Sequence, residues 1–288
     1  AAPFPKNGKG RGVWADLLHY KSEVFKMIYA IQNWIFIFFI YSFLGWCFET
    51  ALVSIEEKRF VNRGFIRSPF LPIYGFGAIT MIVSGTPVIK DPVLVFIFGA
   101  VSATILEFVT GWLLEVIFKT RYWDYSDTHY NFKGRICAEA TLMWGFMTLL
   151  VNYKVHVHIE PIILKLDSQI IMILDIILLI IFIIDFIASA KAAIDVNNML
   201  KRLTEIKNEI SDINLKIKEQ IRNNSESDAK LTSLKQKLEQ LKSENIKNSS
   251  KINFFKKNYL NAHPNSRSLK FNNALTELKI KINEKKKK

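Results

Sequence analysis

The sequence predicts an all-α membrane protein in which a bundle of about five transmembrane helices precedes a charged helical tail. Half of its 288 residues are hydrophobic, and they gather in long runs. The clearest run, 169–193, consists mostly of Ile, Leu, Phe and Ala. A helix needs about 20 apolar residues to cross a hydrocarbon core of about 30 Å, so this run fits a bilayer. The residues behind it turn abruptly charged.

The membrane domain is expected over residues 31–194, after an N-terminal segment of residues 1–30. Five predicted spans share a high hydropathy: 31–54, 70–89, 92–118, 138–153 and 169–193. The second span is interrupted by Pro and Gly residues, and the fourth is short. The exact number of spans is therefore left open.

Lys and Arg residues in the connecting loops predict the orientation of the spans. Loops 55–69 and 119–137 hold four basic residues each, whereas loop 85–91 holds one and loop 154–168 holds two. Basic loops stay in the cytoplasm, so we expect these two loops and the tail on the cytoplasmic side of the cytoplasmic membrane. Five spans then place the N-terminus outside, despite the basic residues that precede the first span. An in-plane amphipathic helix within residues 1–30, or a different span count, would remove that conflict.

The predicted tail, residues 195–288, is strongly basic. It carries 22 Lys and Arg against 11 Asp and Glu, and so +11 of the chain's net charge of +13. A basic segment beside a membrane attracts anionic lipid, by about 1 kcal/mol per residue near the surface. Nucleic acid is another anionic partner, but no recognition motif accompanies the charge, so we do not expect it. A solvated coiled coil is the plainer interpretation.

Apolar residues recur in the tail at alternating steps of three and four, the pattern of a coiled-coil seam. The first seam consists of Val196, Met199, Leu203, Ile206, Ile210, Ile213 and Ile217. After a polar break at 223–227, the second seam consists of Leu231, Leu234, Leu238 and Leu241. Two seams around a break predict an antiparallel helical hairpin. A long intermolecular coiled coil, and with it a homodimer, is the alternative.

Charged residues inside membrane spans are costly, so each one marks a candidate functional site. With the predicted topology, polar groups from several spans and both basic loops converge on the cytoplasmic side, and only Asp175 points to the opposite half. The predicted cavity lining is Glu49, Glu107, Glu115, Glu139, Arg67, Arg135, Asp124, Asn131, Trp123 and Tyr125. Two interpretations compete. These groups form buried ion pairs that fix the register of the helices, or they line a polar cavity that opens to the cytoplasm and binds an ion or polar solute.

The segment Pro69-Phe-Leu-Pro-Ile-Tyr-Gly-Phe-Gly77 combines Pro and Gly residues within a predicted span. Such residues free backbone carbonyls, which membrane proteins tolerate only against protein or a water-filled cavity. Transporters use broken helices of this kind to bind substrates and to hinge. We therefore expect a gate or hinge at Pro72, Tyr74, Gly75 and Gly77. The alternative is a kinked helix that packs closely through its glycines.

The sequence lacks the motifs of several kinds of active site. There is no Gly-x-x-x-x-Gly-Lys-Ser/Thr phosphate loop, so the chain is not itself a P-loop ATPase, and no catalytic triad is evident. Cys47 and Cys137 lack metal-ligand spacing, and His156, His158 and Glu160 lack a fourth ligand. We therefore expect no cofactor and no metal, and an enzyme is the less favoured class.

A series of motifs occurs in order along the chain: Tyr41-Ser-Phe-Leu-Gly-Trp46 with Glu49, Arg63-Gly-Phe65, Pro72-Ile-Tyr-Gly-Phe-Gly-Ala78, Trp123-Asp-Tyr-Ser126 and Asn131-Phe-Lys-Gly-Arg-Ile136. Together they resemble the bacterial family named putative ABC-transporter permease (type IV), over about residues 34–155. The resemblance extends into the tail at Asn261–Asn265 and Ala274–Leu278. It implies a multi-span permease that works with a separate ABC ATPase. Ser68 departs from the family pattern, which has Gly before this Pro.

Three functions follow from these features. The leading one is a permease-like membrane protein that moves an unknown polar or ionic solute through the inward-facing cavity. The second is a membrane-anchored scaffold that recruits a partner or anionic lipid through its coiled-coil tail. The third is a membrane-embedded lipid-modifying enzyme, in which carboxylates near Asp124 and Arg135 act as acid and base at headgroup depth.

Overall fold

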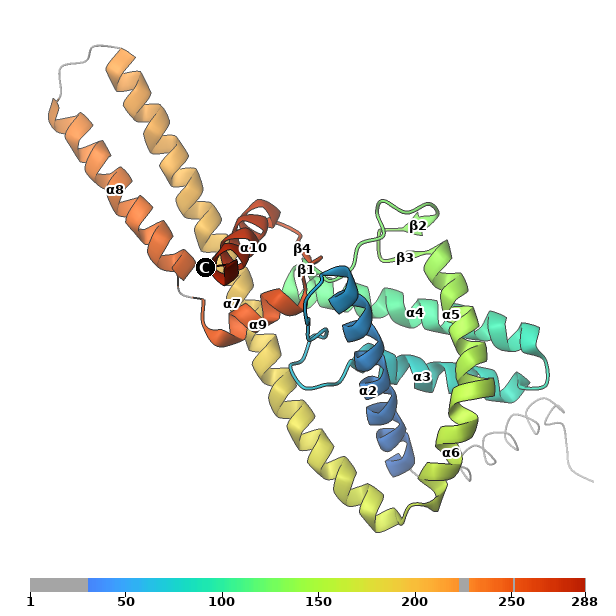
Figure 1. Ribbon diagram of the computed structural model, residues 1–288. Coiled ribbons are helices and arrows are strands. Elements are labelled where there is room, and N and C mark those ends of the chain that lie inside the picture. Colours follow the sequence, from blue (N-terminus) through green and yellow to red (C-terminus); the bar gives the residue numbers. More distant parts are fainter. Residues whose placement is uncertain (1–30, 223–227, 251, 288) are drawn as a thin grey trace, which may run out of the picture.

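The computed structural model describes residues 31–222, 228–250 and 252–287, which are mainly helical (Figure 1). The predicted N-terminal amphipathic segment and the polar break at 223–227 lie outside the described residues. The helices are α2 (Ile31–Glu56), α3 (Pro72–Gly85), the 3-10 turn η1 (Thr86–Val88), α4 (Pro92–Phe118), α5 (Ala138–Leu150), the π-helical turn η2 (Val151–Val155), α6 (His156–Lys165), α7 (Ser168–Arg222), α8 (Asp228–Ser250), α9 (Phe254–Ala262) and α10 (Asn272–Lys287). The strands are β1 (Thr120–Arg121), β2 (Asn131–Phe132), β3 (Ile136–Cys137) and β4 (Arg267–Ser268).

Three helices, α2, α4 and α7, are long and apolar enough to cross a membrane, and α3 with η1 forms a shorter apolar helix. Many large apolar side chains on these helices are exposed, among them Ile173, Ile180 and Ile184 on α7. A soluble monomer rarely exposes a continuous apolar surface of this extent, whereas lipid would cover it. The protein is therefore a helical membrane protein.

The structure differs from the sequence prediction in the fourth apolar segment. A span was expected over 138–153 and a loop over 154–168. Instead α5, η2 and α6 follow one another without a break, because Leu150 and Val155 keep right-handed helical dihedrals. Hydropathy missed this extension because polar residues such as Lys154 interrupt the apolar run.

The helices α2, α3, α4 and α5 pack in chain order, each against the next (Figure 1). Their shared core includes Ile37 of α2, Met81 of α3 and Ala103 of α4. Glycine allows the closest approach, since a Cβ added at Gly45 would overlap the ring of Tyr74 on α3. Small residues serve this purpose in membrane bundles generally, where backbones must approach closely to gain packing contacts.

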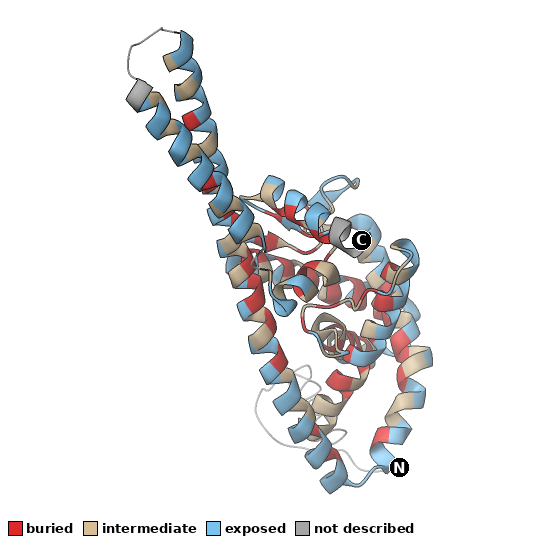
Figure 2. Cartoon of the chain, turned by 60° about the vertical axis from the view of Figure 1, so that its left-hand side comes forward, coloured by how far each residue is buried: buried red, intermediate tan, exposed pale blue. Residues whose placement is uncertain are grey.

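Helix α7 is 55 residues long and extends beyond the bundle. Helix α8 runs back along the distal part of α7 (Figure 1). Ile206 and Ile213 of α7 are buried together with Leu241 of α8. Buried and exposed residues alternate along α7 in Figure 2, as expected for a helix that buries one stripe. The apolar residues of both seams thus meet within a single chain.

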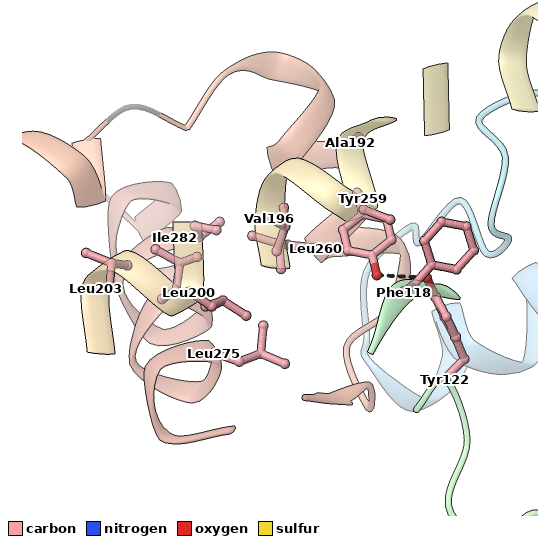
Figure 3. Close-up of a cluster of buried hydrophobic side chains, with 12 residues drawn as sticks. Phe118, Tyr122, Ala192, Val196, Leu200, Leu203, Tyr259, Leu260, Leu275 and Ile282 are labelled. Carbon is pink, nitrogen blue, oxygen red and sulfur yellow. Dashed lines mark hydrogen bonds between the residues drawn. The ribbon is translucent and has the colours of Figure 1, made fainter. Parts of the chain in front are cut away.

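The chain after the hairpin packs onto the end of the membrane bundle (Figure 3). Leu260 of α9 and Leu275 of α10 share a buried cluster with Phe118 at the end of α4. The hydroxyls of Tyr122 and Tyr259 are hydrogen-bonded at 2.9 Å, and strand β4 pairs antiparallel with β1. The C-terminal helices are therefore packed against the end of α4 and the middle of α7.

Candidate functional site

Glu107 is a carboxylate that neutral hydrogen-bond donors hold inside the bundle. It lies in α4 and is 4% exposed. Tyr125 donates its hydroxyl to Oε1 at 3.0 Å, and Trp144 of α5 donates its indole N–H to Oε2 at 2.9 Å. No basic side chain in the described part of the chain lies within ion-pair distance of it. An isolated buried charge is costly, so a carboxyl group of this kind either keeps a proton or faces a cation.

Glu49 of α2 is connected to this group. Its Oε1 accepts a hydrogen bond from the Tyr74 hydroxyl at 2.7 Å, and its Oε2 lies 3.7 Å from Nε of Arg63. The ring of Tyr74 packs edge-on against that of Trp144, with centroids 6.4 Å apart. Because Trp144 also holds Glu107, the two carboxylates are linked through two aromatic side chains.

We call this set the acidic row: Glu49, Tyr74, Glu107, Tyr125 and Trp144. Four helices and one loop contribute to it, so it exists only when the bundle is assembled. Burial, and then the Glu107 carboxylate, raise the pKa of Tyr125 well above its usual value. Tyr125 therefore stays protonated and remains a hydrogen-bond donor at neutral pH.

Glu115, two helical turns further along α4, is held in a different way. Its Oε1 accepts from Nε of Arg121 at 2.8 Å, and its Oε2 accepts from Nη2 and Nε of Arg135 at 2.5 and 3.1 Å. The carboxylate is buried and faces two guanidinium groups. This arrangement matches the ion-pair interpretation, since it fastens the loop between α4 and α5 onto α4.

Asp124 joins this loop to the C-terminal segment. Its Oδ1 accepts from Nη1 of Arg121 at 2.9 Å, and its Oδ2 accepts from Nη1 of Arg267 in β4 at 3.1 Å. Burial opposes ionisation of Asp124, but hydrogen bonds from Ser126 and then the charge of Arg121 hold its pKa below the usual value. The ionised Asp124 thus connects the loop between α4 and α5 to strand β4, which is distant in sequence.

Two further residues of the predicted cavity build the same loop. The Trp123 indole donates to the backbone carbonyl of Arg135 at 2.9 Å. The Asn131 side chain donates to the carbonyl of Thr128 at 2.8 Å and accepts from the N–H of Gly134 at 3.1 Å. Gly134 has a φ of +67°, which favours glycine. Trp123 and Asn131 shape the loop that presents Tyr125.

Arg67 and Glu139 do not join the acidic row. Nε of Arg67 donates to Asp185 of α7 at 3.0 Å, and the backbone N–H of Ser68 donates to the other oxygen of Asp185 at 2.5 Å. Glu139 is exposed, and no partner for it occurs among the residues that the structure describes. The structure therefore does not bring all the predicted lining residues together in one cavity.

The predicted hinge forms the start of a regular helix. Pro72 is the first residue of α3, and the helix continues without interruption to Gly85. A Cβ added at Gly75 would overlap Ser42 of α2, whereas a Cβ added at Gly77 would meet nothing within 4 Å. Close packing thus explains the glycine at position 75, and Tyr74 is the member of this set that reaches the acidic row.

Sequence reasoning missed two partners of the carboxylates. Trp144 is not among the predicted lining residues, and Arg121 entered only as one of the four basic residues of loop 119–137. A signal was present in the first case, because a buried indole N–H usually finds an acceptor, and glutamates were the acceptors available. The pairing of Arg121 with Glu115 depends on how the loop folds back onto α4.

His156, His158 and Glu160 lie in the first half of α6. The described part of the chain contains no group of three His, Cys, Asp or Glu side chains placed to hold a metal ion. His156 is buried, with Nδ1 3.3 Å from the Tyr41 hydroxyl. Cys137 precedes α5, and its sulfur accepts the N–H of Ala140 at 3.4 Å.

Comparison with known proteins places the chain in a family. The family described as "Putative ABC-transporter type IV" matches residues 36–190, which is more than half of the chain. The match contains the whole acidic row and the loop that presents Tyr125. Comparison with curated proteins and with solved structures finds no match. The chain belongs to the putative ABC-transporter type IV family.

Proposed function

We propose that this protein is the membrane subunit of a transporter, and that the acidic row binds a cationic solute during its passage. The observation that carries the proposal is Glu107, a carboxylate buried in the bundle with neutral donors as its described partners. Glu49 supplies a second carboxylate nearer the loop that follows α2. A metal cation or a protonated amine would neutralise Glu107, which neither Tyr nor Trp can do, whereas Glu49 already lies 3.7 Å from Nε of Arg63.

Both glutamates of the row are capped by tyrosine hydroxyls. Tyr74 covers Glu49 at 2.7 Å, and Tyr125 covers Glu107 at 3.0 Å. We assign the gate to these two side chains, because a cation that binds Oε1 of either glutamate takes the position of the tyrosine hydroxyl and displaces its hydrogen bond. Tyr125 lies on a loop, so its movement requires no rearrangement of a helix.

The same proposal includes five crossings of the cytoplasmic membrane, at 31–56, 72–88, 92–118, 138–165 and 168–193. Three contacts support a common end for the basic loops and the C-terminal helices. Arg63 donates to the carbonyl of Ala262 at 3.1 Å, Arg267 donates to Asp124 at 3.1 Å, and β1 pairs with β4. The basic charge of these loops supports a cytoplasmic location for that end.

A separate ABC ATPase would dock at this end, as the family description suggests. The test is mass spectrometry of the proteins that co-purify with the natively expressed full chain. A stoichiometric P-loop ATPase is the expected result. Self-association without an ATPase would contradict it, and would favour a stand-alone transporter or a membrane scaffold.

Neutralising Glu107 tests the acidic row. In a Glu107→Gln variant the amide N–H₂ donates to the Tyr125 hydroxyl, which also accepts, and the amide oxygen accepts from Trp144. The fold should therefore survive while the charge is lost. We expect at least about a hundredfold loss of cation or amine uptake into proteoliposomes that contain the complete transporter, the scale of a lost charged contact in a low-dielectric site.

Glu139→Gln is the matched control, because Glu139 is an exposed glutamate of the same domain. It should transport as the unmodified protein does. Full uptake by Glu107→Gln, with normal membrane accumulation, would remove the acidic row as the solute site. A loss of accumulation in Glu107→Gln would instead mean that the carboxylate serves the fold.

A further inference from the structure

A pocket of about 260 Å³ lies at the end of the bundle, beside the residues at which α7 leaves the predicted span 169–193. The loop after α2, one turn of α7 and helix α9 line it, and Figure 1 shows α9 lying against α7. Its polar lining includes Arg59 and Arg67 from the loop, Ser189 from α7 and Asn258 from α9. The described residues that line it include no acidic side chain.

Ser189 indicates that the pocket takes a ligand. Its side chain is 5% exposed, yet its Oγ has no hydrogen-bond partner in the described structure. A buried hydroxyl left without a partner costs about 1–3 kcal/mol. Because Ser189 lines the pocket, an oxygen atom of a bound molecule would complete the missing hydrogen bond.

Both arginines line the pocket, and each donates one hydrogen bond to a carboxylate. Nε of Arg67 donates to Asp185 at 3.0 Å, and its guanidinium stacks 4.6 Å from the ring centroid of Phe255. Arg59 uses Nη2 for Glu57 at 3.2 Å. A guanidinium has five N–H donors in a planar fork that matches two oxygens of a phosphate. These ion pairs therefore orient the arginines without using up their donors.

The rest of the lining is largely apolar and includes Phe60, Phe65, Ile66, Ala188 and Ala192. Phe60 is 72% exposed, which suits a side chain at the edge of a bilayer. A ligand that fits both halves of the pocket carries an oxyanion on an apolar stem. At the end of a transmembrane bundle, the molecule with that chemistry is a phospholipid.

We infer that this pocket binds the phosphate of an anionic phospholipid. Arg59 and Arg67 contact the phosphate oxygens, Ser189 donates to a phosphate or glycerol oxygen, and the apolar residues contact the glycerol and the upper acyl chains. The site does not depend on the acidic row, and it is more specific than a general attraction of the basic tail to lipid. Inorganic phosphate presents the same oxygen atoms as a phospholipid headgroup, so the experiment must distinguish these two ligands.

The test is native mass spectrometry of the detergent-solubilised full chain, titrated separately with phosphatidylglycerol, phosphatidylcholine and inorganic phosphate. We expect phosphatidylglycerol to bind most tightly. Arg59→Gln and Arg67→Gln should each weaken its binding about tenfold, the scale of one charge-assisted contact. Ser189→Ile should prevent binding by filling the pocket.

Arg202→Gln is the matched control, because Arg202 is a surface arginine of α7 that pairs with Glu244 away from the pocket. It should leave the affinity unchanged. Arg59→Gln keeps the test decisive if Arg67→Gln fails to fold, since the described ion pair of Arg59 joins it only to Glu57 on the same loop.

Each outcome of the titration has one meaning. Tight binding of inorganic phosphate with the same dependence on the variants would support the phosphate site and assign it a soluble source. Equal affinity for phosphatidylglycerol and phosphatidylcholine would overturn the anionic assignment. Phosphatidylglycerol binding that none of the three pocket variants weakens would overturn the site itself.

Discussion

Glu107 and Glu115 lie on the same helix and are both buried, but the donors that contact Glu107 are neutral and those that contact Glu115 are charged. Glu115 is surrounded by two guanidinium groups, whereas Glu107 accepts from a phenol and an indole. A buried carboxylate between two cations stabilises the fold, because moving either partner leaves an unpaired charge. The carboxylate that meets only neutral donors keeps the capacity to attract a cation. Glu115 thus fits the ion-pair interpretation, and the proposed solute site rests on Glu107.

Removing the charge of Glu115 should destabilise the protein. In Glu115→Gln, Arg135 loses its ion pair with Glu115, and Arg121 keeps its ion pair with Asp124. Breaking a buried ion pair by removing one partner costs about 3–5 kcal/mol, and the partly exposed arginines put this case at the lower end. The measurement is thermal unfolding of the detergent-solubilised protein. Exposed Glu139→Gln, the control, should stay within about 0.5 kcal/mol of the unmodified protein. An unchanged Tm for Glu115→Gln would refute the fastening role.

At the scale of elements, a buried histidine fastens the C-terminal segment to the loop after α2. His263 follows α9 and is 4% exposed, with Nδ1 3.4 Å from Nη1 of Arg63. The ring of Tyr122 packs edge-on at 4.8 Å between centroids. Lys279 of α10 is half-buried and donates to the carbonyl of Ser266 at 2.7 Å. Burial and then Arg63 lower the pKa of Lys279 to about 8.

The docking of this segment should weaken in acid. Burial, and then the charges of Arg63 and Lys279, lower the pKa of His263 well below 6.5. Below pH 6.5 the undocked segment binds a proton that the docked segment does not, so stability falls as the pH falls. Between pH 6.5 and 5 the undocked population should rise about tenfold. The measurement is the rate of limited proteolysis within 252–270.

His263→Gln provides the control for this pH dependence. It keeps a hydrogen-bond acceptor near Arg63 but does not titrate in this range. The difference in cleavage rate between the two pH values should therefore largely disappear in the variant. Equal pH dependence in both proteins would show that another group controls the docking.

At the scale of the whole molecule, the described residues form three buried clusters with different roles. One joins α2, α3 and α4 inside the bundle. A second joins the C-terminal helices to the end of α4 and the middle of α7, and a third lies between α7 and α8. The first two hold the acidic row and the phospholipid pocket in place. The third lies in the distal hairpin and contacts neither site.

Shortening the hairpin should therefore leave the bundle intact. Replacement of residues 208–238 by a short Gly-Ser linker keeps Ile206, Leu241 and the ion pair between Arg202 and Glu244. We expect membrane accumulation and Tm to remain close to those of the full chain, measured on the detergent-solubilised protein. Deletion of residues 252–288 should instead reduce accumulation several-fold, because it uncovers Phe118, Tyr122 and their apolar neighbours.

The hairpin variant also separates two functional classes. A transporter should keep its solute uptake after the shortening, whereas a scaffold that recruits partners through the hairpin should lose partner binding. Complete loss of uptake, with normal accumulation in the membrane, would show that the hairpin itself takes part in transport. Its surface would then become the first place to search for the ATPase.

Much of the architecture could be predicted from local properties of the chain. The ends of α2 and α4 lie within a few residues of the predicted spans, because apolar runs of bilayer length are visible without any tertiary contact. The fourth segment was harder to predict, since residues such as Lys154 and His158 conceal the helix that continues to Lys165. Helical backbone there depends on packing rather than on hydropathy.

The sequence by itself determined that this chain is a helical membrane protein of its family, and which carboxylates lie within its apolar segments. Only the tertiary structure decided which partner each carboxylate meets. Arg67 pairs with Asp185 rather than with a glutamate, and Trp144 rather than an arginine holds Glu107. The reason is geometric, because an ion pair requires two side chains within about 4 Å. That distance depends on how helices rotate and loops fold back, which the position of a charge in the sequence does not specify.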